Sequence, residues 1–276
     1  MELYSLTSYE VSRLVTQLYS TSFSGSIKLF SRGIQPHIYA IYGLTRIADE
    51  IVDTYRGKDA VSLLVDLESK VYVAIKRGYS ANPIVSAFAL TAERYKIDHT
   101  LLKPFFASMA MDLEPATFTD QRYAEYIHGS AEVVGLMCLR VFVNGDIREY
   151  ERLRDAASAL GSAYQKINFL RDLAADYKDL GRVYFPGVQF EDFNDTLKEE
   201  IVSDIEEDLQ KASRGLMELP DSSRRAVNLS VLYYGRLLRK LKNTPATEIK
   251  QRRIRLNAGV KLSLLLTSLF KGRPGV

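Results

Sequence analysis

The amino-acid sequence predicts an all-α protein. Apolar residues recur with the 3.6-residue period of a helix along most of the 276 residues, and no convincing stretch alternates between apolar and polar as a strand does. Only eight prolines are present, and most fall where helices would begin or end. Because we find no internal repeat and no Pro-, Gly- or Ser-rich linker, we expect one helical domain over residues 1–276, long enough for a sizeable core.

Ten segments carry the helical period. Pro36 should open the second helix, because a proline ring suits the first helical turn, and Pro186, Pro220 and Pro245 should lie in connections. The longest irregular stretch should be 181–194. The expected helices cover residues 7–20, 34–56, 60–77, 83–96, 100–113, 120–143, 147–178, 195–217, 222–243 and 247–270.

The charges are unevenly distributed. The net charge of +3 is too small to indicate binding to nucleic acid, but from Arg236 to the C-terminus the sequence has eleven Lys or Arg residues and one acid, Glu248. This basic segment is either a solvated helix face or a surface that lies against phosphates or an anionic membrane. No signal peptide and no apolar run of about 20 residues is visible. We therefore expect a cytoplasmic protein, with at most peripheral contact with the inner face of the membrane.

The cysteine content agrees with a reducing compartment. Cys138 is the one cysteine in the sequence, so no internal disulfide can form. It lies in the apolar run 133–139, and we expect it to be a small buried core residue.

A polar stripe crosses the helix expected over 34–56. Tyr42, Arg46, Asp49 and Asp53 are spaced i, i+4, i+7 and i+11, which puts them on one helical face. The other positions are mostly apolar or small, so this helix should be buried. Its stripe should then face something polar inside the fold.

The two aspartates of this stripe require a partner. Like charges at i, i+4 repel weakly on an exposed helix and strongly when they are buried. A divalent cation would remove the repulsion, and Mg²⁺ prefers carboxylate oxygens while it keeps positions open for phosphate. A DxxxD pair alone is more often a solvated acidic face, so this stripe does not decide the matter by itself.

A second stripe shifts the balance towards a metal site. Gln165, Asn168, Asp172 and Asp176 recur at i, i+3, i+7 and i+11, again among apolar residues. Arg171 lies beside them, and a planar guanidinium can grip a diphosphate with two hydrogen bonds. Two such stripes in one helical chain predict facing walls of one cavity, with metal ions that bridge to an anionic substrate.

These motifs and their neighbours carry a family resemblance. The sequence resembles the phytoene/squalene synthase family over most of its length, and within that family it is most like the bacterial phytoene synthases. The last two of the matching blocks are together highly specific. The blocks are Ser20-Thr21-Ser22-Phe23, Tyr42-x-x-x-Arg46-x-x-Asp49-Glu50-Ile51-Val52-Asp53, the segment from Tyr126 through Val134-Gly135-Leu136-Met137, Gln165-x-x-Asn168-x-x-Arg171-Asp172-x-x-x-Asp176, and Gly181-Arg182-Val183-Tyr184-Phe185-Pro186.

The resemblance implies the isoprenoid-synthase fold, a helical bundle around a deep central cavity. Two facing helices would hold Mg²⁺, or Mn²⁺ in its place, and Tyr126 would lie near the reacting centre. The implied metal ligands are Asp49, Asp53, Asn168, Asp172 and Asp176, and the four aspartates would share the catalytic role with Tyr126. The residues implied to contact substrate are Ser20, Thr21, Ser22, Phe23, Tyr42, Arg46, Gln165, Arg171, Tyr234 and Arg253.

The implied reaction is the head-to-head condensation of two prenyl diphosphates. Loss of diphosphate would give an allylic cation, and the second substrate would attack it to form a cyclopropylcarbinyl diphosphate that ionises again. We expect two geranylgeranyl diphosphates to give phytoene, in carotenoid biosynthesis. NADPH is not expected, because no Gly-rich nucleotide motif is visible. The alternative is a squalene or dehydrosqualene synthase that acts on farnesyl diphosphate.

Three departures from the family pattern bear on the substrate. Glu50 stands where many relatives have Asp, Ala175 stands where an acid is common, and the interval from Asp176 to Gly181 is one residue longer than usual. None of these departures removes an implied metal ligand, so they leave the reaction type in place. Chain length stays open, and no linear motif reports it, the product stereochemistry or the oligomeric state.

Three other classes of protein would also place acids on helices. A di-iron bundle typically needs two Glu-x-x-His motifs, and Glu125 with His128 is the single one here, so we expect His128 to pack near the cavity instead. Head-to-tail elongation and terpene cyclisation use similar acidic motifs, but the 181–186 block argues against both. A catalytically inactive assembly protein is the third class, and the presence of every implied ligand argues against it.

Overall fold

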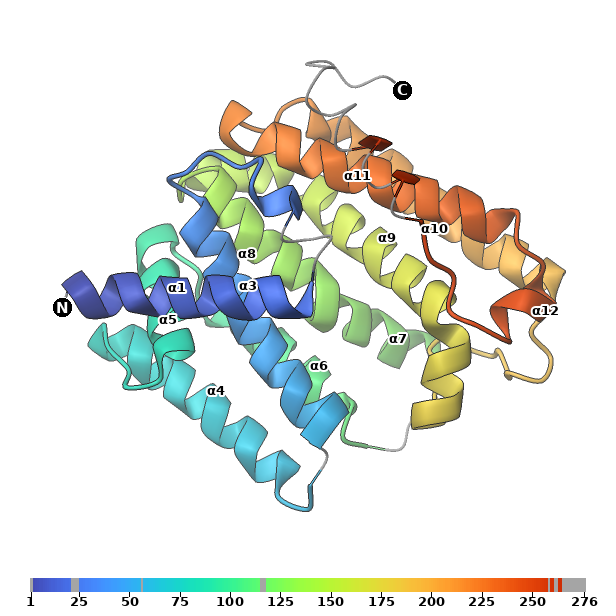
Figure 1. The fold of residues 1–276 in the computed structure, drawn as a ribbon, viewed down its shortest axis with the longest axis horizontal. Helices are drawn as coiled ribbons and strands as arrows, with labels where there is room; N and C mark the ends of the chain where they lie inside the picture. The colour runs from blue at the N-terminus through green and yellow to red at the C-terminus, as the bar shows by residue number, and fades with distance from the viewer. Residues whose placement is uncertain are drawn as a thin grey trace.

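Helices make up most of the described part of the chain, and no strand is found within it. The computed structural model describes residues 2–20, 25–55, 57–114, 118–257, 259–260 and 263–264. The predicted all-α class is confirmed (Figure 1). The elements, with η for a π-helix, are α1 (Glu2–Tyr19), α3 (Gln35–Asp49), η1 (Glu50–Tyr55), α4 (Ala60–Arg77), α5 (Pro83–Tyr95), α6 (His99–Met111), α7 (Asp120–Ile127), η2 (His128–Glu132), α8 (Val133–Phe142), α9 (Ile147–Leu180), α10 (Asp195–Leu216), α11 (Asp221–Lys242) and α12 (Ala246–Ile249).

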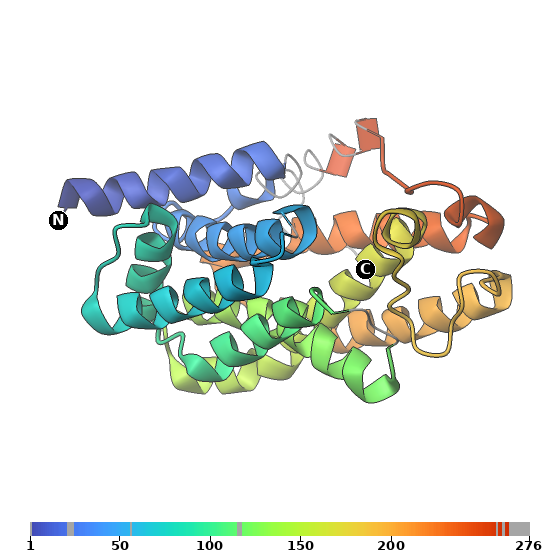
Figure 2. The ribbon, with the colours of Figure 1, turned by 90° about the horizontal axis from the view of Figure 1, so that it is seen from below.

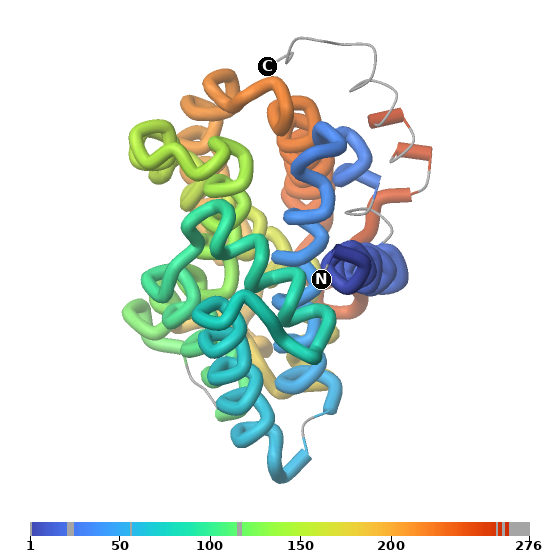
Figure 3. Tube along the Cα trace, turned by 90° about the vertical axis from the view of Figure 1, so that its left-hand side faces the viewer, coloured from blue at the N-terminus to red at the C-terminus, as the bar shows by residue number. Residues whose placement is uncertain are grey.

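The longest element, α9, runs through the fold. Its 34 residues span about 51 Å at 1.5 Å per residue, and it packs against α8, η2 and α10. Helix α1 lies on the outside, against α3 and α5 (Figure 2). The segment after α12 lies on the same outer side of the molecule as α1, as Figure 3 shows from a second direction.

Two groups of buried apolar side chains form the core. The first group contains residues of α3, α4, α5, α6 and α8 and of the start of α9, and it includes Phe88 and Leu102. The second surrounds the later part of α9 together with α10 and α11, and it includes Leu170. Because α9 contributes Leu153 to the first group and Ile167 to the second, this helix holds the two groups together.

The outermost helix, α1, buries hydroxyl groups and exposes leucines. Ser8, Ser12 and Thr16 are fully buried, while Leu18 is 74% exposed. Each buried hydroxyl donates to the backbone carbonyl oxygen four residues earlier, which satisfies it without a partner from another helix. The small side chains let α1 approach α3, since a Cβ added at Gly43 would lie 3.2 Å from Ser12 Oγ.

Two predicted helices change to π-helical geometry. The helix predicted over 34–56 is α-helical only to Asp49 and continues as η1. The helix predicted over 120–143 contains η2 between its two α-helical parts. Short π-helical turns are rare overall, but many of those that occur lie at functional sites. The π-helix η1 carries the second aspartate of the first stripe.

Glycines allow η2 to fit between α6 and α9. A Cβ added at Gly129 would collide with the carbonyl oxygen of Pro104 on α6. A Cβ added at Gly161 on α9 would lie 2.8 Å from the carbonyl oxygen of Ala131, which is closer than real side chains approach. The close packing of these three elements therefore depends on the absence of a side chain at both positions.

The prediction of a helix over 247–270 is wrong for the first part of that range. Helix α12 has only four residues, and the chain from 253 to 257 is not helical. The N–H of Ile254 donates to the carbonyl oxygen of Arg171 at 3.4 Å. Ile254 and Leu256 are buried, whereas the residues on either side of each are exposed, so this segment follows the two-residue period of an extended chain.

The other predicted boundaries agree to within a few residues, except that α1 begins earlier, at Glu2. Pro36 lies in the first turn of α3, and the stretch 181–194 contains no helix, both as predicted. Within the described ranges, none of the helices is long and apolar enough to cross a bilayer.

We expect Gly161→Ala to lower the free energy of unfolding by about 1–3 kcal/mol, because the added methyl group forces α9 away from η2. The matched control is Gly235→Ala on α11, where no atom lies within 4 Å of the added Cβ. This control should gain roughly 0.5–1 kcal/mol from the better helix propensity of alanine. Urea unfolding followed by circular dichroism measures both changes, and equal effects of the two substitutions would contradict the close packing.

Candidate active site

The first polar stripe contains an arginine that is held by its neighbours. Arg46 on α3 donates through Nη2 to Glu50, and its Nη1 lies 3.8 Å from Asp49 Oδ2. The guanidinium carbon also lies 4.4 Å from the ring centroid of Tyr19, at the end of α1. Glu50 therefore orders Arg46, and Arg46 is in place beside the first aspartate of the stripe.

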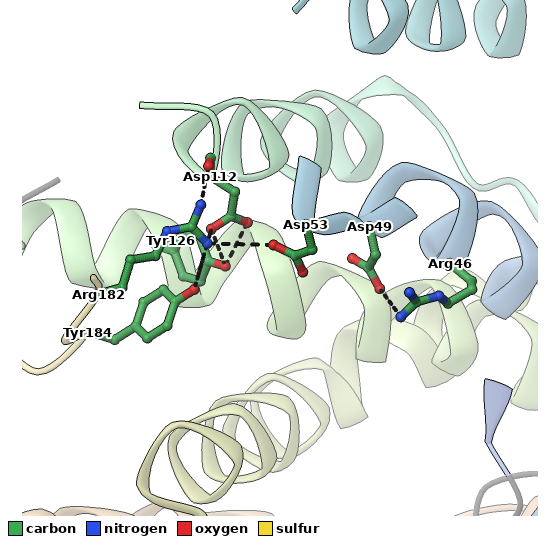
Figure 4. A network of polar contacts seen from close by, with 7 residues as sticks. All are labelled: Arg46, Asp49, Asp53, Asp112, Tyr126, Arg182 and Tyr184. Atoms are coloured by element: carbon green, nitrogen blue, oxygen red, sulfur yellow. Dashed lines mark hydrogen bonds and ion pairs between the residues drawn. The ribbon is translucent and has the colours of Figure 1, made fainter. Parts of the chain in front are cut away.

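The two aspartates of this stripe have different neighbours (Figure 4). Asp49 lies beside Arg46, whereas Asp53 Oδ1 lies 3.5 Å from Arg182 Nη1. Burial raises the pKa of Asp49 to about 7, opposed by Arg46 and reinforced by the charges of Asp53 and Asp112. Yet 36% of the Asp49 side chain stays accessible.

The second stripe lies on α9, and two arginines share one of its acids. Asp172 accepts hydrogen bonds from Arg171 at 2.6 and 2.9 Å, and Arg253 Nε lies 2.6 Å from Asp172 Oδ1. Burial raises the pKa of Asp176 to about 7, and the charges of Asp172 and Asp53 reinforce the shift. Arg182 links the two stripes, because its backbone N–H donates to the carbonyl oxygen of Asp176 at 3.1 Å and its Nη1 lies 3.5 Å from Asp53 Oδ1. The two stripes therefore lie close together.

An amide and two tyrosines extend the second stripe. The Tyr234 hydroxyl donates to Asn168 Oδ1 at 3.3 Å. The Tyr234 ring stacks on Tyr164 with centroids 3.9 Å apart, and burial raises the pKa of both hydroxyls. Tyr234 on α11 is thus hydrogen-bonded to Asn168 on α9, a predicted metal ligand, although the two residues are far apart in the sequence.

The block that begins at Ser20 is described only at its first residue. Ser20 forms a hydrogen bond with Tyr42 of the first stripe, and burial raises the pKa of Tyr42 against the opposing charge of Arg46. Thr21, Ser22 and Phe23 lie outside the described residues.

An apolar cavity of about 270 Å³ adjoins the second stripe. Its walls come from α3, η2, α8, α9, α10 and α11, and along α9 it extends from Gln165 to Leu153. Twelve residues of α-helix correspond to about 18 Å. Gln165 therefore belongs to the polar stripe and to the cavity wall at once.

Comparison with known proteins identifies the family. The sequence profile described as squalene/phytoene synthase matches residues 16–259. The chain belongs to the squalene/phytoene synthase family. This family condenses prenyl diphosphates head to head, and the predicted resemblance is confirmed.

Named relatives in the squalene/phytoene synthase family are moderately similar. The 4,4'-diapophytoene synthase of Staphylococcus haemolyticus is 27% identical over 199 residues, which cover 71% of this chain and 68% of that protein. The phytoene synthase of Arthrospira platensis is 30% identical over 65% of this chain and 61% of that protein. Phytoene synthase 1 of Arabidopsis thaliana is 30% identical over 73% of this chain, which spans only 52% of the plant protein.

Solved structures of family members share the fold. A dehydrosqualene synthase in complex with ligand superimposes with a TM-score of 0.81, at 19% identity and over 96% of both chains. Squalene synthase HpnC from Alicyclobacillus acidocaldarius superimposes with a TM-score of 0.76, at 20% identity, over 87% of this chain and 95% of that one. The expected isoprenoid-synthase fold is confirmed.

A fifth aspartate, which the sequence did not single out, lies beside the two stripes. Asp112, directly after α6, is 4% exposed and accepts a hydrogen bond from the Tyr126 hydroxyl at 2.8 Å. Arg182 Nη1 donates to it at 2.9 Å, and Tyr184 adds a longer contact of 3.5 Å. The available signal was one acid in the mostly apolar stretch 100–113, without a second acid at helical spacing.

Gly181 explains why the Gly-Arg-Val-Tyr-Phe-Pro block turns back to the site. It ends α9 with a φ of 65°, in the left-handed region that favours glycine. The turn places Arg182 and Tyr184 beside Asp112, where burial raises the pKa of Asp112 to about 7 against the opposing charge of Arg182.

One sequence expectation outside the stripes is corrected, and another is refined. His128 is 48% exposed on η2 and pairs with Glu132 at 2.9 Å, so its side chain does not pack near the cavity. Cys138 packs against the first core as expected, but it is only partly buried and also lines the apolar cavity, where burial raises the pKa of its thiol to about 12.

The side chains that the sequence predicts as metal ligands lie on two separate segments, Asp49 and Asp53 on α3 and η1, and Asn168, Asp172 and Asp176 on α9. Among the described residues, no three His, Cys, Asp or Glu side chains lie close enough together to hold one metal ion by themselves. Mg²⁺ is commonly held by one or two carboxylates together with substrate phosphates, and either wall supplies two carboxylates. The donor atoms, all hard oxygens, fit that ion.

We expect Asp176→Asn to raise the melting temperature of the metal-free protein more at pH 8 than at pH 5.5. The folded-state pKa of about 7 lies above the unfolded value of about 3.9, so the folded protein holds a proton that the unfolded chain has lost between these values. The stability of the wild type therefore falls as the pH rises towards 7, and asparagine removes that loss.

Thermal unfolding in EDTA at the two pH values measures the difference. Asp155→Asn is the control, because its side chain is fully exposed on the same helix, and it should shift the melting temperature equally at both pH values. An Asp176→Asn effect that is independent of pH would contradict the facing arrangement of the acids.

Proposed function

We propose that this protein condenses two prenyl diphosphates head to head, and that two geranylgeranyl diphosphates give phytoene. What supports the proposal is a single juxtaposition: two acid-bearing helical faces lie close together, and one of them continues through Gln165 into the wall of an apolar cavity. The polar end suits a diphosphate and the apolar end suits its prenyl tail. Membership of the squalene/phytoene synthase family supports the same reaction.

We propose Mg²⁺, or Mn²⁺ in its place, as the cofactor. Asp49 and Asp53 on one wall, and Asn168, Asp172 and Asp176 on the other, would hold the ions. The raised pKa of Asp49 and of Asp176 reflects poor hydration first and then repulsion by neighbouring acids, including Asp53 in both cases, and a divalent cation would relieve that repulsion. When bound, the ions neutralise the diphosphate as it leaves.

The arginines of the site are proposed to bind the diphosphates. Arg46, Arg171 and Arg253 are already held beside acids of the two stripes. A guanidinium that faces a phosphate can make two parallel hydrogen bonds to it. Tyr42 and Tyr234 would close the polar end of the cavity, and the apolar walls would keep water from the reactive cation.

The choice of a C20 substrate rests on the names of relatives and on the extent of the apolar cavity. Several relatives are named phytoene synthase, while the Staphylococcus haemolyticus relative is named 4,4'-diapophytoene synthase. The cavity alone extends along about 18 Å of α9 beyond the polar stripe. The alternative is farnesyl diphosphate as substrate, which would make a squalene or dehydrosqualene synthase. We propose that no NADPH is used.

We also propose that the protein is cytoplasmic and that any membrane contact is peripheral, through the basic segment from Arg236 onwards. Arg236 and Arg239 on α11 are exposed. Exposed cations near an anionic lipid surface contribute about 1 kcal/mol each, and salt weakens this attraction.

Asp49→Ala and Asp172→Ala should each lower turnover of geranylgeranyl diphosphate by at least roughly a hundredfold, because each removes an oxygen ligand from one wall. Diphosphate release is measured with Mg²⁺ and with EDTA, and the helical circular dichroism signal should be unchanged. Asp155→Ala on the exposed side of α9 is the control and should keep wild-type rates. Wild-type rates in either ligand variant would remove the metal assignment, and no turnover by the wild type would favour an inactive assembly protein.

Phe142→Ala should raise the ratio of kcat/KM for C20 over C15 diphosphate by about tenfold, since the variant lengthens the cavity. Gly161 lies beside Ala131 and Gly135 beside Ala157, so α8 runs antiparallel to α9 and ends near the far end of the cavity. There the Phe142 ring stacks on the Phe30 ring, with the two ring centroids 5.2 Å apart.

Mass analysis of the products from C15 and C20 diphosphates offered together gives the preference of the wild type and of this variant. Ala156→Ser, on the cavity wall but not at its end, is the matched control and should keep the wild-type ratio. An unchanged ratio in Phe142→Ala would show that the tail does not reach the Phe30–Phe142 pair.

A further inference from the structure

We propose that Asp112 is a positioning residue that keeps the Arg182 guanidinium from pairing fully with the Asp53 carboxylate, and so leaves Asp53 free to bind metal. The inference rests on the proposed function, because it concerns the metal site of that reaction. Asp112 lies outside both polar stripes, and through Arg182 it acts on Asp53 of the first stripe.

The contacts of Arg182 are unequal (Figure 4). Its Nη1 donates to Asp112 Oδ1 at 2.9 Å, and its Nη2 donates to the backbone carbonyl oxygen of the same residue. A third contact, of 3.2 Å, joins Nη1 to the Tyr184 hydroxyl. By comparison, Asp53 lies at 3.5 Å, which is within the range of an ion pair but too long for a good hydrogen bond.

The burial of the pair makes the anchoring strong. The side chains of Asp112 and Arg182 are 4% and 7% exposed, whereas that of Asp53 is 45% exposed. A buried charge that loses its partner must find another, because water cannot replace the lost interaction. If Asp112 loses its charge, the nearest acid for Arg182 is Asp53, and the charge of Asp176 also lies within its influence.

A guanidinium that pairs with Asp53 competes with a divalent cation for the same oxygens. The guanidinium and the divalent cation are both positively charged, so pairing of Asp53 with the guanidinium reduces the attraction that remains for the metal ion. Asp112 thus acts through Arg182 on the metal site, without contact with the ion itself.

Tyr126 is held by the same carboxylate. Its hydroxyl donates to Asp112, and its ring packs against Phe118, Phe169 and Tyr184 with centroids 5.2 to 5.9 Å apart. The aromatic neighbours hold the ring of Tyr126, so that loss of the Asp112 charge should move Arg182 more than it moves Tyr126.

The test is the binding of Mg²⁺ together with inorganic pyrophosphate, measured by isothermal titration calorimetry without prenyl substrate. Asp112→Asn keeps the shape of the side chain and removes its charge, and it should weaken binding by about 10–100-fold, the usual range for a residue that supports a metal ligand. The double variant Asp112→Asn/Arg182→Gln removes the competing cation as well and should recover most of the wild-type affinity. A purely structural role of Asp112 would not give this recovery.

Asp208→Asn is the matched control. Asp208 is 8% exposed and accepts hydrogen bonds from Lys166 at 2.8 Å and from Ser162 at 2.7 Å, between α9 and α10. Its loss should lower the melting temperature, as the loss of Asp112 does, but should leave the binding of Mg²⁺ and pyrophosphate unchanged.

The outcomes separate this inference from the proposed function. If the wild type binds Mg²⁺ and pyrophosphate and Asp112→Asn binds equally well, the inference is overturned and the function stands. If the wild type binds neither Mg²⁺ nor pyrophosphate, the inference and the proposed function are both overturned. If Asp112→Asn does not fold, the double variant decides, because wild-type affinity supports the inference and a tenfold loss overturns it.

Discussion

The site depends on one constraint, which is that several carboxylates lie close together where water solvates them poorly. Three of these groups, on α3, after α6 and on α9, have pKa values raised to about 7, first by burial and then by the charges of neighbouring acids. Each wall also carries guanidinium groups that offset part of the charge. The acids are Asp49, Asp53, Asp112, Asp172 and Asp176, and the arginines beside them are Arg46, Arg171, Arg182 and Arg253.

The fold keeps these charges together by rigid packing around them. Helix α9 carries one acidic face and is fixed on its other sides by both apolar cores and by the buried Lys166–Asp208 pair with α10. Close approach of α6, η2 and α9 requires glycine at 129 and 161. An array of like charges is tolerated because the cores supply the stability that the site itself lacks.

The stripes could be predicted because each lies within one continuous helical segment. Spacing of i, i+4 places two side chains on one face of an α-helix whatever the rest of the fold does, and Asp172 and Asp176 on α9 obey that rule. Asp53 departs from it, because the chain becomes π-helical after Asp49. Asp112 has no such partner on its own helix, and its neighbours Arg182 and Tyr184 come from a segment about 70 residues later. Position along one helix cannot report a contact of that kind.

By itself, the amino-acid sequence determined the helical class, most helix boundaries, the two polar stripes and the family, because all of these depend on local period and on spacing within single segments. Only the tertiary structure decided which side of a helix is buried, as the exposed leucines of α1 show. It also decided that 253–257 packs as an extended chain and that Arg182 is shared between Asp53 and Asp112. The physical reason is that burial and ion pairing are set by the neighbours that packing brings close, which a residue's position in the chain does not specify.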